Sequence, residues 1–417
     1  MKAEIICIGT ELLLGQIVDT NAAFLAREIA GLGIDLYYKA TVGDNLKRIV
    51  DTLKTAWDRA DLLVLSGGLG PTQDDLTREA VAGLIGEELE FNEDAWSQVQ
   101  NYFNKTQRPN VESNRRQAMF PKSGRIISNH LGTAPCLLVE KENHIIIALP
   151  GVPRELKGVW EVSVKPYLTQ VLISENSPIL TSRLIKMVGI GESAMEERII
   201  DLINNQTNPT IAPYAGTGEV MLRVTAKGFN EDDNKRLIEE TTIRIRERLS
   251  SYIYGYDTDN LETMIGKLLK RNGWSLALAE SCTGGLIANR ITNIPGSSDY
   301  YLGGVNSYSN ELKINIVGVP EEIISTYGAV SPETAEAMAE GIRKVTSAEV
   351  GLAATGIAGP GGGSAEKPVG LVYLAVATPE KTRVEKRIFP FDRMGNKEAA
   401  TQAGLTLLWQ KLKSVDS

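Results

Sequence analysis

Short apolar runs that end in small polar residues constrain the fold of this chain most. Residues 4–8, 62–66, 275–279 and 350–354 are such runs, and glycine, serine or threonine follows each of them closely. Helix signals lie between the runs. Buried strands that alternate with helices are typical of a mostly parallel sheet with helices on both faces. We therefore predict an α/β fold class.

The length of 417 residues exceeds one ordinary core and indicates two or three domains. We expect an α/β domain over residues 1–171 and a second over residues 258–417, each with three layers. Between them, residues 172–257 carry strand and helix signals in the order βαββα, which predicts a small α+β module. This module has no cluster of catalytic-looking residues, so we interpret it as a spacer or dimerisation module.

Composition excludes several classes of site. The chain has two histidines, His130 and His144, and both lie far upstream of residue 258. A Ser-His-Asp triad within the last third is therefore impossible. Three cysteines and two histidines also exclude a zinc finger or a cysteine-rich zinc cluster. Any metal would be held mainly by Asp and Glu oxygens, which favours a hard, Mg²⁺-like ion.

Charge and hydropathy narrow the partners and the compartment. The net charge of −8 offers no basic surface, so nucleic acid is not expected as the main ligand. No apolar stretch reaches about 18 residues, so no membrane-spanning helix is expected. Residues 1–4 lead into a strand without a signal-peptide pattern, and cysteines are sparse. These features predict a cytoplasmic protein.

Three motifs in the last third supply the groups for acyl transfer without histidine. They occupy residues 279–285, 305–313 and 354–362, and each follows a strand-like run. We expect Ser281 at a strand-to-helix turn, where its hydroxyl is exposed above the sheet. Lys313 follows the next strand, and a buried lysine with a lowered pKa can serve as its general base. Tyr308 could relay a proton or position the lysine.

The same motifs provide binding groups, and some alternatives remain open. Amides at the start of a helix beginning at Thr283 could stabilise an oxyanion together with Thr355 and Gly356. The glycine-rich loop over residues 359–363 lets the backbone approach a phosphate, and Arg393 could clamp that phosphate. Cys282 or Thr283 could replace Ser281 as nucleophile. Lys313 could be a surface lysine, Arg393 a structural ion-pair partner and Glu280 a structural group.

These motifs, over roughly residues 258–415, resemble the C-terminal domain of the CinA (competence/damage-inducible protein A) family and the stand-alone PncC-type nicotinamide-nucleotide amidases. The resemblance implies conversion of nicotinamide mononucleotide to nicotinic acid mononucleotide and ammonia, with no cofactor for the amidase. It implies Ser281, Lys313 and Tyr308 as catalytic residues. The substrate-binding residues that it implies are Thr283, Gly284, Gly285, Asn310, Thr355, Gly356, Gly359, Gly361 and Arg393.

A second group of candidate site residues lies in residues 8–21 and 66–80. It resembles the molybdopterin-binding fold of MoaB, MogA and the MoeA/gephyrin group, and most of all the N-terminal domain of the CinA family. Leu69 stands where the molybdopterin proteins usually have threonine, which argues against molybdopterin as the ligand. The CinA-type domain implies metal-dependent hydrolysis of ADP-ribose at its diphosphate.

Glycine amides can surround a diphosphate, and carboxylates can hold a divalent cation that bridges its oxygens. The residues expected at this site are Glu11, Asp19, Asn21, Gly67, Gly68, Gly70, Thr72 and Arg154. The expected metal ligands are Asp44, Asp74 and Asp75. Alternatively, Asp19 and Asn21 are helix caps, Asp74 and Asp75 complement a helix dipole, and Arg154 faces solvent.

The resemblance thus implies an amidase for nicotinamide mononucleotide, with a second diphosphate hydrolase activity. The alternative is a nucleotide-binding scaffold or regulatory protein with one or both sites inactive. Expected ligands are small nucleotides, and the resemblance implies a homodimer.

Overall fold

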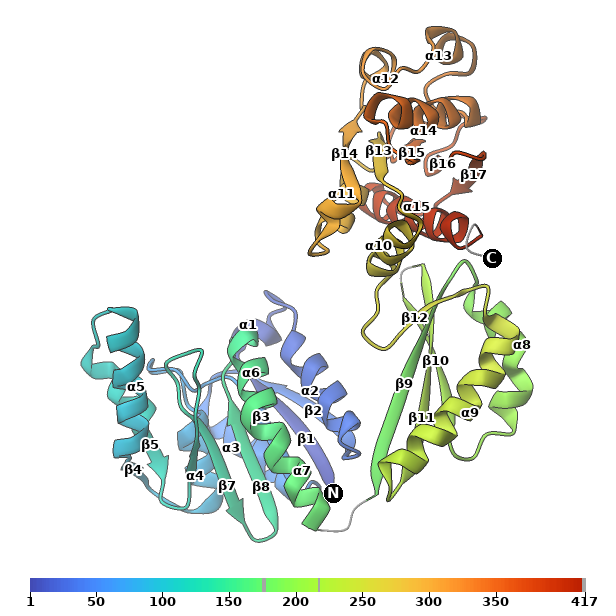
Figure 1. Cartoon of the computed structure of the whole chain (residues 1–417). Helices are drawn as coiled ribbons and strands as arrows, with labels where there is room; N and C mark the ends of the chain where they lie inside the picture. Colours follow the sequence, from blue (N-terminus) through green and yellow to red (C-terminus); the bar gives the residue numbers. More distant parts are fainter. Residues whose placement is uncertain (175–177, 217, 415–417) are drawn as a thin grey trace. The chain divides into compact units, whose positions relative to one another are not determined.

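The computed structural model describes residues 1–174, 178–216 and 218–414. The chain divides into two compact units (Figure 1). One comprises Met1–Thr181 with Ala226–Lys235, and the other comprises Ser182–Thr225 with Arg236–Ser417. None of the helices in the described ranges is both long and apolar enough to cross a membrane.

A six-stranded sheet forms the centre of the first unit, in the order β2-β1-β3-β8-β7-β6. Its first four strands are parallel, whereas β7 pairs antiparallel with both β8 and β6. The mostly parallel sheet is as predicted, and β7 and β8 form an antiparallel hairpin. The strands are β1 (Lys2–Ile8), β2 (Asp35–Val42), β3 (Leu62–Ser66), β6 (Arg125–Ile127), β7 (Cys136–Lys141) and β8 (His144–Leu149).

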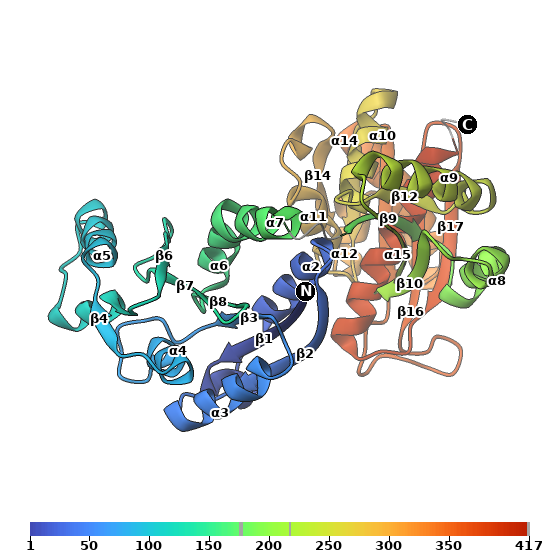
Figure 2. The same cartoon turned by 90° about the horizontal axis from the view of Figure 1, so that it is seen from below.

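Helices cover both faces of this sheet because β1 and β3 are apolar on both sides. Ile6 and Leu63 pack with α3 and α4, whereas Ile5 and Val64 pack with α2 and α6. Figure 2 views this layered arrangement from another side. The helices are α1 (Thr10–Leu13), α2 (Thr20–Gly31), α3 (Leu46–Trp57), α4 (Thr77–Ile85), α5 (Glu93–Thr106), η1 (Glu112–Ala118), α6 (Pro153–Val159), η2 (Trp160–Val164) and α7 (Lys165–Ser174). A small separate sheet pairs β4 (Leu89–Phe91) with β5 (Met119–Pro121).

The middle segment forms a four-stranded sheet with two helices, in the strand order β10-β11-β9-β12. The predicted βαββα order is present, and β12 extends it by one strand that the sequence did not predict. Its elements are β9 (Ile179–Val188), α8 (Glu192–Asn204), β10 (Thr210–Gly216), β11 (Glu219–Gly228), α9 (Glu231–Leu249) and β12 (Ile253–Tyr256).

The C-terminal sheet has the order β14-β13-β15-β16-β17. β13 is parallel to β14 and β15, whereas β16 and β17 are antiparallel additions. Parallel pairing brings the ends of β13, β14 and β15 to one edge of the sheet, where the three motifs begin. The strands are β13 (Leu276–Glu280), β14 (Tyr301–Asn306), β15 (Val350–Gly356), β16 (Leu371–Ala377) and β17 (Thr382–Ile388).

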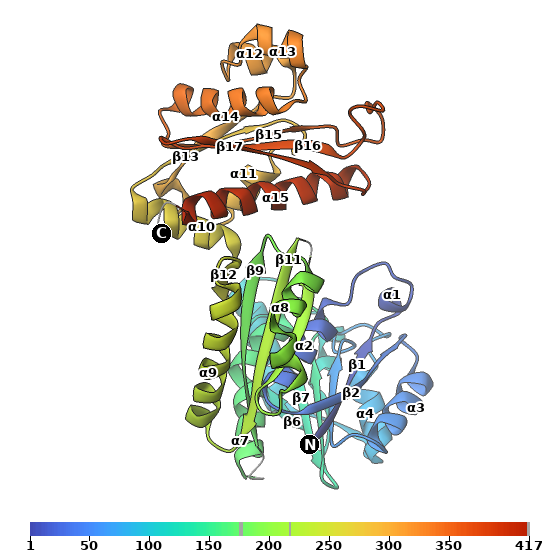
Figure 3. The ribbon, with the colours of Figure 1, turned by 90° about the vertical axis from the view of Figure 1, so that its right-hand side faces the viewer.

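Helices again lie on both faces of this sheet, with α14 on one side and α15 on the other (Figure 3). Leu276 and Leu278 pack toward α10 and α15, whereas Ala277 and Ala279 pack toward α14. The helices are α10 (Leu261–Asn272), α11 (Leu286–Thr292), η3 (Ser297–Asp299), α12 (Asn310–Asn315), α13 (Glu321–Tyr327), α14 (Pro332–Thr346) and α15 (Arg393–Lys413).

Candidate active sites

Ser281 and Lys313 meet at the edge where β13 and β14 end. Ser281 follows β13 directly, and its amide donates to Ala354 O of the neighbouring strand at 2.9 Å. Lys313, on α12, places Nζ 3.1 Å from Ser281 Oγ. The same Nζ donates to Ser307 O at 2.7 Å. The pairing expected from the motif spacing is therefore present as a direct side-chain contact.

Lys313 is a buried lysine, not a surface one. Its residue is 1% exposed, and burial lowers the pKa of its amine below the ordinary lysine value. The helix that carries it is short and is capped by Ser309, whose hydroxyl accepts from the amide of Leu312 at 3.2 Å. This cap begins α12 just after the strand end and turns Lys313 inward. A lowered pKa increases the fraction of neutral amine, the form that can accept a proton.

Glu280 organises the turn that carries Ser281. Its buried carboxylate accepts hydrogen bonds from Thr283 Oγ1 at 2.7 Å and from the amide of Gly285 at 3.0 Å. It also accepts from the amides of Ile287 at 3.1 Å and Ala288 at 2.8 Å, in the first turn of α11. A carboxylate at a helix N-terminus satisfies amides that have no partner within the helix. The N-cap residue of α11 is Gly285, and the Glu280 carboxylate binds the amides of the first turn.

This arrangement corrects the expected position of the helix after Ser281. The helix begins at Leu286 and not at Thr283, because Gly284 and Gly285 adopt φ of +65° and +93°. The amide of Gly285 is bound to Glu280, so it is not available for an oxyanion. Gly284 is exposed, and a Cβ there would lie 3.4 Å from Lys397 Nζ.

The three candidate nucleophiles differ in their surroundings. The Thr283 hydroxyl is fully buried and donates to Glu280. Cys282 is 6% exposed, and burial raises the pKa of its thiol to about 12, which disfavours the reactive thiolate. Ser281 is the member of the three whose hydroxyl contacts the Lys313 amine. The geometry therefore favours Ser281.

Tyr308 and Arg393 form a separate pair above the glycine-rich loop. Arg393 Nη2 donates to the Tyr308 hydroxyl at 2.9 Å, and Nη1 donates to Gly359 O at 2.5 Å. In the described part of the chain the Tyr308 hydroxyl bonds to Arg393 and not to Lys313, the lysine that it was expected to position. Arg393 is the first residue of α15, which Asp392 caps. Arg393 is exposed and bonds to a carbonyl oxygen, and no carboxylate of the described residues forms an ion pair with it.

The remaining predicted binding residues divide into packing and exposed groups. Thr355 is buried and its hydroxyl donates to Ala329 O at 2.7 Å, so that hydroxyl has a structural role. A Cβ at Gly356 would lie 2.6 Å from Leu371 O, so glycine at this position allows the neighbouring strand to pack closely. Gly361, in the loop after β15, has open space around it. Asn310 is exposed at the start of α12.

A second site is a cavity of about 570 Å³ in the first unit, at the ends of β1, β3 and β8. Many of the residues predicted from the N-terminal motifs line it: Glu11, Asp44, Gly67, Gly68, Gly70, Asp74 and Asp75. Two of these glycines allow close packing, because a Cβ would lie 2.2 Å from Ile8 O at Gly67 and 2.2 Å from Thr77 Oγ1 at Gly68.

Four of the predicted residues lie outside the cavity lining. Asp19 is the cap of α2 and accepts from the amide of Ala22 at 2.8 Å. Asn21 is buried and donates to Gly151 O at 2.7 Å and to the Ser66 hydroxyl at 3.1 Å. These two therefore hold α2 and the strand ends in place. The other two are Thr72, which bonds to Asp74 and Asp75, and Arg154, which is exposed.

The three predicted metal ligands do not form a ready-made cluster. Asp44 accepts from the amide of Thr10 at 2.8 Å, and Asp75 accepts from the Thr72 amide at 2.8 Å. The Thr72 hydroxyl also lowers the pKa of Asp74. Within the described ranges, no three Asp, Glu, His or Cys side chains lie close enough to hold an ion together. Thr72 of the same loop bonds to Asp74 and Asp75, and the amide of Thr10 bonds to Asp44.

The sequence reasoning missed three polar residues of this cavity: Gln117, Thr133 and Glu155. Gln117 is fully buried; its Nε2 donates to Thr133 Oγ1 at 3.1 Å, and its Oε1 has no hydrogen-bond partner among the described residues. Glu155 accepts from Asn129 Nδ2 at 2.8 Å. Glu155 directly follows Arg154 in the sequence and was within reach of sequence reasoning. Gln117 lies in η1, where no pattern marked it.

Comparison with known proteins identifies three consecutive stretches. Residues 4–170 match a probable molybdopterin binding domain, residues 182–255 match the damage-inducible protein CinA KH domain, and residues 258–412 match the CinA C-terminal domain.

Relatives named as competence-damage inducible proteins match along the whole chain. The protein of Moorella thermoacetica is 47% identical over 414 residues, and that of Halothermothrix orenii is 48% identical over 414 residues. Each match covers 99% of both chains. A solved CinA structure from Thermoplasma acidophilum is 35% identical and covers 40% of this chain and 98% of its own, with a TM-score of 0.38. The identity over the full length shows that this chain belongs to the CinA family of competence/damage-inducible proteins.

Proposed function

We propose that the C-terminal domain hydrolyses the carboxamide of nicotinamide mononucleotide to nicotinic acid mononucleotide and ammonia. The observation that carries this proposal is the contact between Ser281 Oγ and the buried amine of Lys313 at 3.1 Å. An amide carbonyl is a poor electrophile, so hydrolysis near neutral pH needs an activated nucleophile. A serine beside a lysine of lowered pKa meets that need.

The first half-reaction forms an acyl-enzyme. The neutral amine of Lys313 accepts the hydroxyl proton of Ser281 while Oγ attacks the carboxamide carbon. The carbonyl oxygen becomes an oxyanion in the tetrahedral intermediate. Collapse of this intermediate breaks the C–N bond, and the Lys313 ammonium returns its proton to the departing nitrogen. Ammonia leaves, and an ester joins Ser281 to the nicotinoyl group.

The second half-reaction consumes water. Lys313, again neutral, accepts a proton from a water molecule whose oxygen attacks the ester carbon. The ester bond to Ser281 breaks and Oγ recovers its proton from Lys313. The products are the free acid and the restored enzyme, and no redox step or metal is required.

We propose that Arg393 and Tyr308, beside the glycine-rich loop, bind the phosphate of the nucleotide. A guanidinium binds phosphate through two parallel hydrogen bonds. Arg393 already projects over the loop through its contacts with Gly359 O and the Tyr308 hydroxyl. A phosphate could replace the tyrosine as partner of Nη2. Exposed Gly361 leaves the adjacent backbone open to the same phosphate.

Ammonia release from nicotinamide mononucleotide in the presence of EDTA tests this proposal. We expect release by the wild type, and loss by at least about a thousandfold in Ser281→Ala and Lys313→Ala, because each removes half of the reacting pair. Lys344→Ala, at an exposed lysine of α14, is the matched control and keeps full activity. Release that survives Ser281→Ala would move the nucleophile elsewhere, and no release by folded wild type would refute the amidase.

We propose a second activity for the N-terminal cavity: hydrolysis of ADP-ribose to AMP and ribose 5-phosphate with a divalent metal. Supporting it, glycines of the loop after β3 and the carboxylates of Asp74 and Asp75 line the same cavity. Mg²⁺ is commonly held by one or two carboxylates together with substrate phosphates, so a preformed three-ligand cluster is not needed. The ion would supply Lewis-acid stabilisation at the diphosphate.

Product formation from ADP-ribose with Mg²⁺ and with EDTA tests this second proposal. Asp75→Asn is expected to abolish turnover, whereas Asp94→Asn, at an exposed position of α5, is the control. Ser281→Ala should leave this activity unchanged. If nucleotides bind at either site but no product forms, the alternative of a binding or regulatory scaffold holds. Homodimerisation and a cytoplasmic location remain proposals, to be checked by sedimentation and by fractionation.

A further inference from the structure

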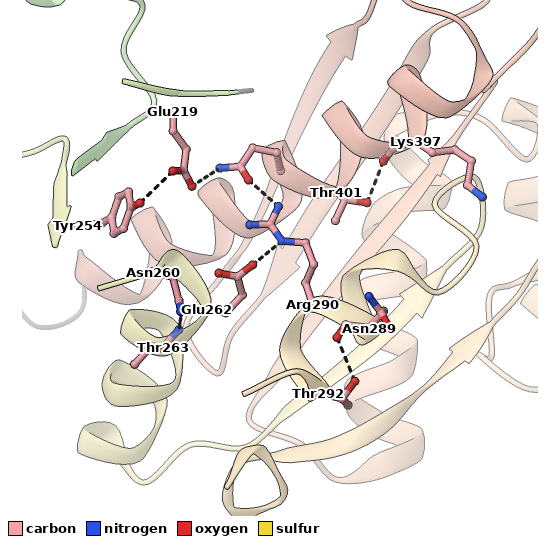
Figure 4. Close-up of polar contacts among 11 residues, drawn as sticks. Glu219, Tyr254, Asn260, Glu262, Thr263, Asn289, Arg290, Thr292, Lys397 and Thr401 are labelled. Atoms are coloured by element: carbon pink, nitrogen blue, oxygen red, sulfur yellow. Dashed lines mark hydrogen bonds and ion pairs between the residues drawn. The ribbon is translucent and has the colours of Figure 1, made fainter. Parts of the chain in front are cut away.

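A chain of polar side chains joins the small α+β module to the C-terminal domain. Glu219, on β11, accepts from the Tyr254 hydroxyl at 3.0 Å and from Gln402 Nε2 at 3.3 Å (Figure 4). Arg290 Nη1 donates to Gln402 Oε1 at 2.6 Å, and its Nε donates to Glu262. We call these five residues the junction network.

The junction network is largely removed from solvent. Tyr254 is 4% exposed, Gln402 is 6% and Glu262 is 9%. Burial and the neighbouring Glu219 raise the pKa of the Tyr254 hydroxyl, which stays protonated as a donor. A buried polar group without a partner is costly, so the members of such a network depend on one another. Losing one partner disturbs the position of the next.

Arg290 connects the network to the catalytic turn. It lies on α11, the seven-residue helix whose first turn is bound to Glu280. Glu280 also binds Thr283 and directly precedes Ser281. The same helix is therefore held at its N-terminal end by the catalytic turn and near its C-terminal end by Gln402 and Glu262.

We infer that Glu219, Gln402 and Arg290 are positioning residues for Ser281, through which the α+β module holds α11 and the turn before it. The inference rests on the proposed amidase for its kinetic consequence. The module thereby acquires a role in catalysis beyond that of a spacer. None of the three residues contacts Ser281 or Lys313 in the described structure, so the effect is on geometry and not on the chemical groups themselves.

An exchange of amide and carboxylate tests the inference. Gln402→Glu alone places a carboxylate against that of Glu219 and removes the donor between them. The double variant Glu219→Gln with Gln402→Glu restores every contact: the new amide donates to the new carboxylate, which accepts from Arg290, and Tyr254 donates to the amide oxygen. Gln100→Glu, at an exposed position of α5, controls for the added charge.

Two readouts are measured on the full-length chain. Hydrogen exchange of the amides in residues 283–292 should be roughly tenfold faster in Gln402→Glu, the equivalent of losing about one hydrogen bond. The kcat for ammonia release should fall roughly tenfold, with KM changed by less than about twofold, because the Arg393 region is untouched. The double variant should return both values to within about threefold of the wild type.

The outcomes separate the inference from the proposed function. If Gln402→Glu leaves exchange in residues 283–292 at the wild-type rate, the inference is wrong. It is also wrong if the double variant keeps the wild-type melting temperature but not the wild-type exchange rate. If the wild type releases no ammonia, the amidase fails, and the exchange data alone decide whether the junction network holds α11. A kcat loss equal to that of Gln100→Glu would overturn the kinetic part.

Discussion

Replacing Glu280 by glutamine tests the carboxylate that binds the turn carrying Ser281. The carboxylate is 2% exposed and accepts four hydrogen bonds, three at Oε2 and one at Oε1. Glutamine has nearly the same shape but offers one oxygen and one NH₂ group. If its oxygen takes the position of Oε2, its NH₂ faces the amide of Ala288, and two donors oppose each other.

The cost follows from these contacts. A buried donor left without an acceptor costs about 1–3 kcal/mol. The loss of a negative charge at the start of α11 adds about 1 kcal/mol. The change therefore destabilises the C-terminal domain by about 2–4 kcal/mol. For a domain of this size, each kcal/mol lowers the melting temperature by about 2–4 °C, so a fall of roughly 5–15 °C is expected.

Calorimetry of the full-length chain measures this change. Thr283→Val removes one of the four donors and leaves the carboxylate, so its transition should fall by only about 2–4 °C. Glu366→Gln, an exposed position in the glycine-rich loop region, should stay within about 1 °C of the wild type. A melting temperature of Glu280→Gln equal to that of Glu366→Gln would show that this carboxylate does not hold the turn.

Three further substitutions probe the same site. Burial lowers the folded-state pKa of Lys313 below its ordinary value near 10.5, so the unfolded chain binds more protons between those two pKa values. The wild type should therefore gain stability relative to Lys313→Met as the pH rises from 7 to 10 in thermal melts, and parallel curves would contradict this. Cys282→Ala should keep ammonia release within about threefold of the wild type. Iodoacetamide should leave the Cys282 thiol of the wild type unmodified at pH 7.5, because burial raises the pKa of this thiol to about 12. Arg393→Lys should raise the KM for nicotinamide mononucleotide roughly tenfold with little change in kcat, since an ammonium cannot bind phosphate through two parallel bonds; an equal fall in kcat would place Arg393 in the chemical step.

Much of the fold could be predicted because the central strands are apolar on both faces. The run 62–66 is fully buried as β3, and the run 275–279 differs from β13 by one residue at each end. Strand β17 was not predicted, because its sequence Thr-Arg-Val-Glu-Lys-Arg-Ile is mostly charged. It is an edge strand defined by its pairing with β16, and such pairing leaves little trace in a local pattern.

The sequence predicted that the motifs carrying Ser281 and Lys313 lie together, but not the hydrogen bonds within the site. Parallel strands explain why Ser281 and Lys313 come together, since both follow strands that end at one edge. Nothing local distinguishes the Thr283 hydroxyl from that of Ser281; their difference arises from Glu280, which captures Thr283. In the same way, the sequence around Asp19 fits a ligand and a helix cap equally well. In the structure its side chain accepts from the amide of Ala22, as a helix cap does.

The hydrogen bonds of Glu280 also support the proposed role of Lys313 as a general base. An ion pair between Glu280 and Lys313 would favour the charged amine and raise its pKa, which would remove the neutral form that the proposed reaction needs. The four donors of the turn and of α11 instead bind the Glu280 carboxylate, and Lys313 makes its contacts with Ser281 Oγ and Ser307 O. Desolvation is then the main influence on the amine, with a smaller opposing one from Cys282. The Glu280 carboxylate thus fixes the turn that carries Ser281, the proposed nucleophile, while burial keeps the pKa of Lys313, the proposed base, below its ordinary value.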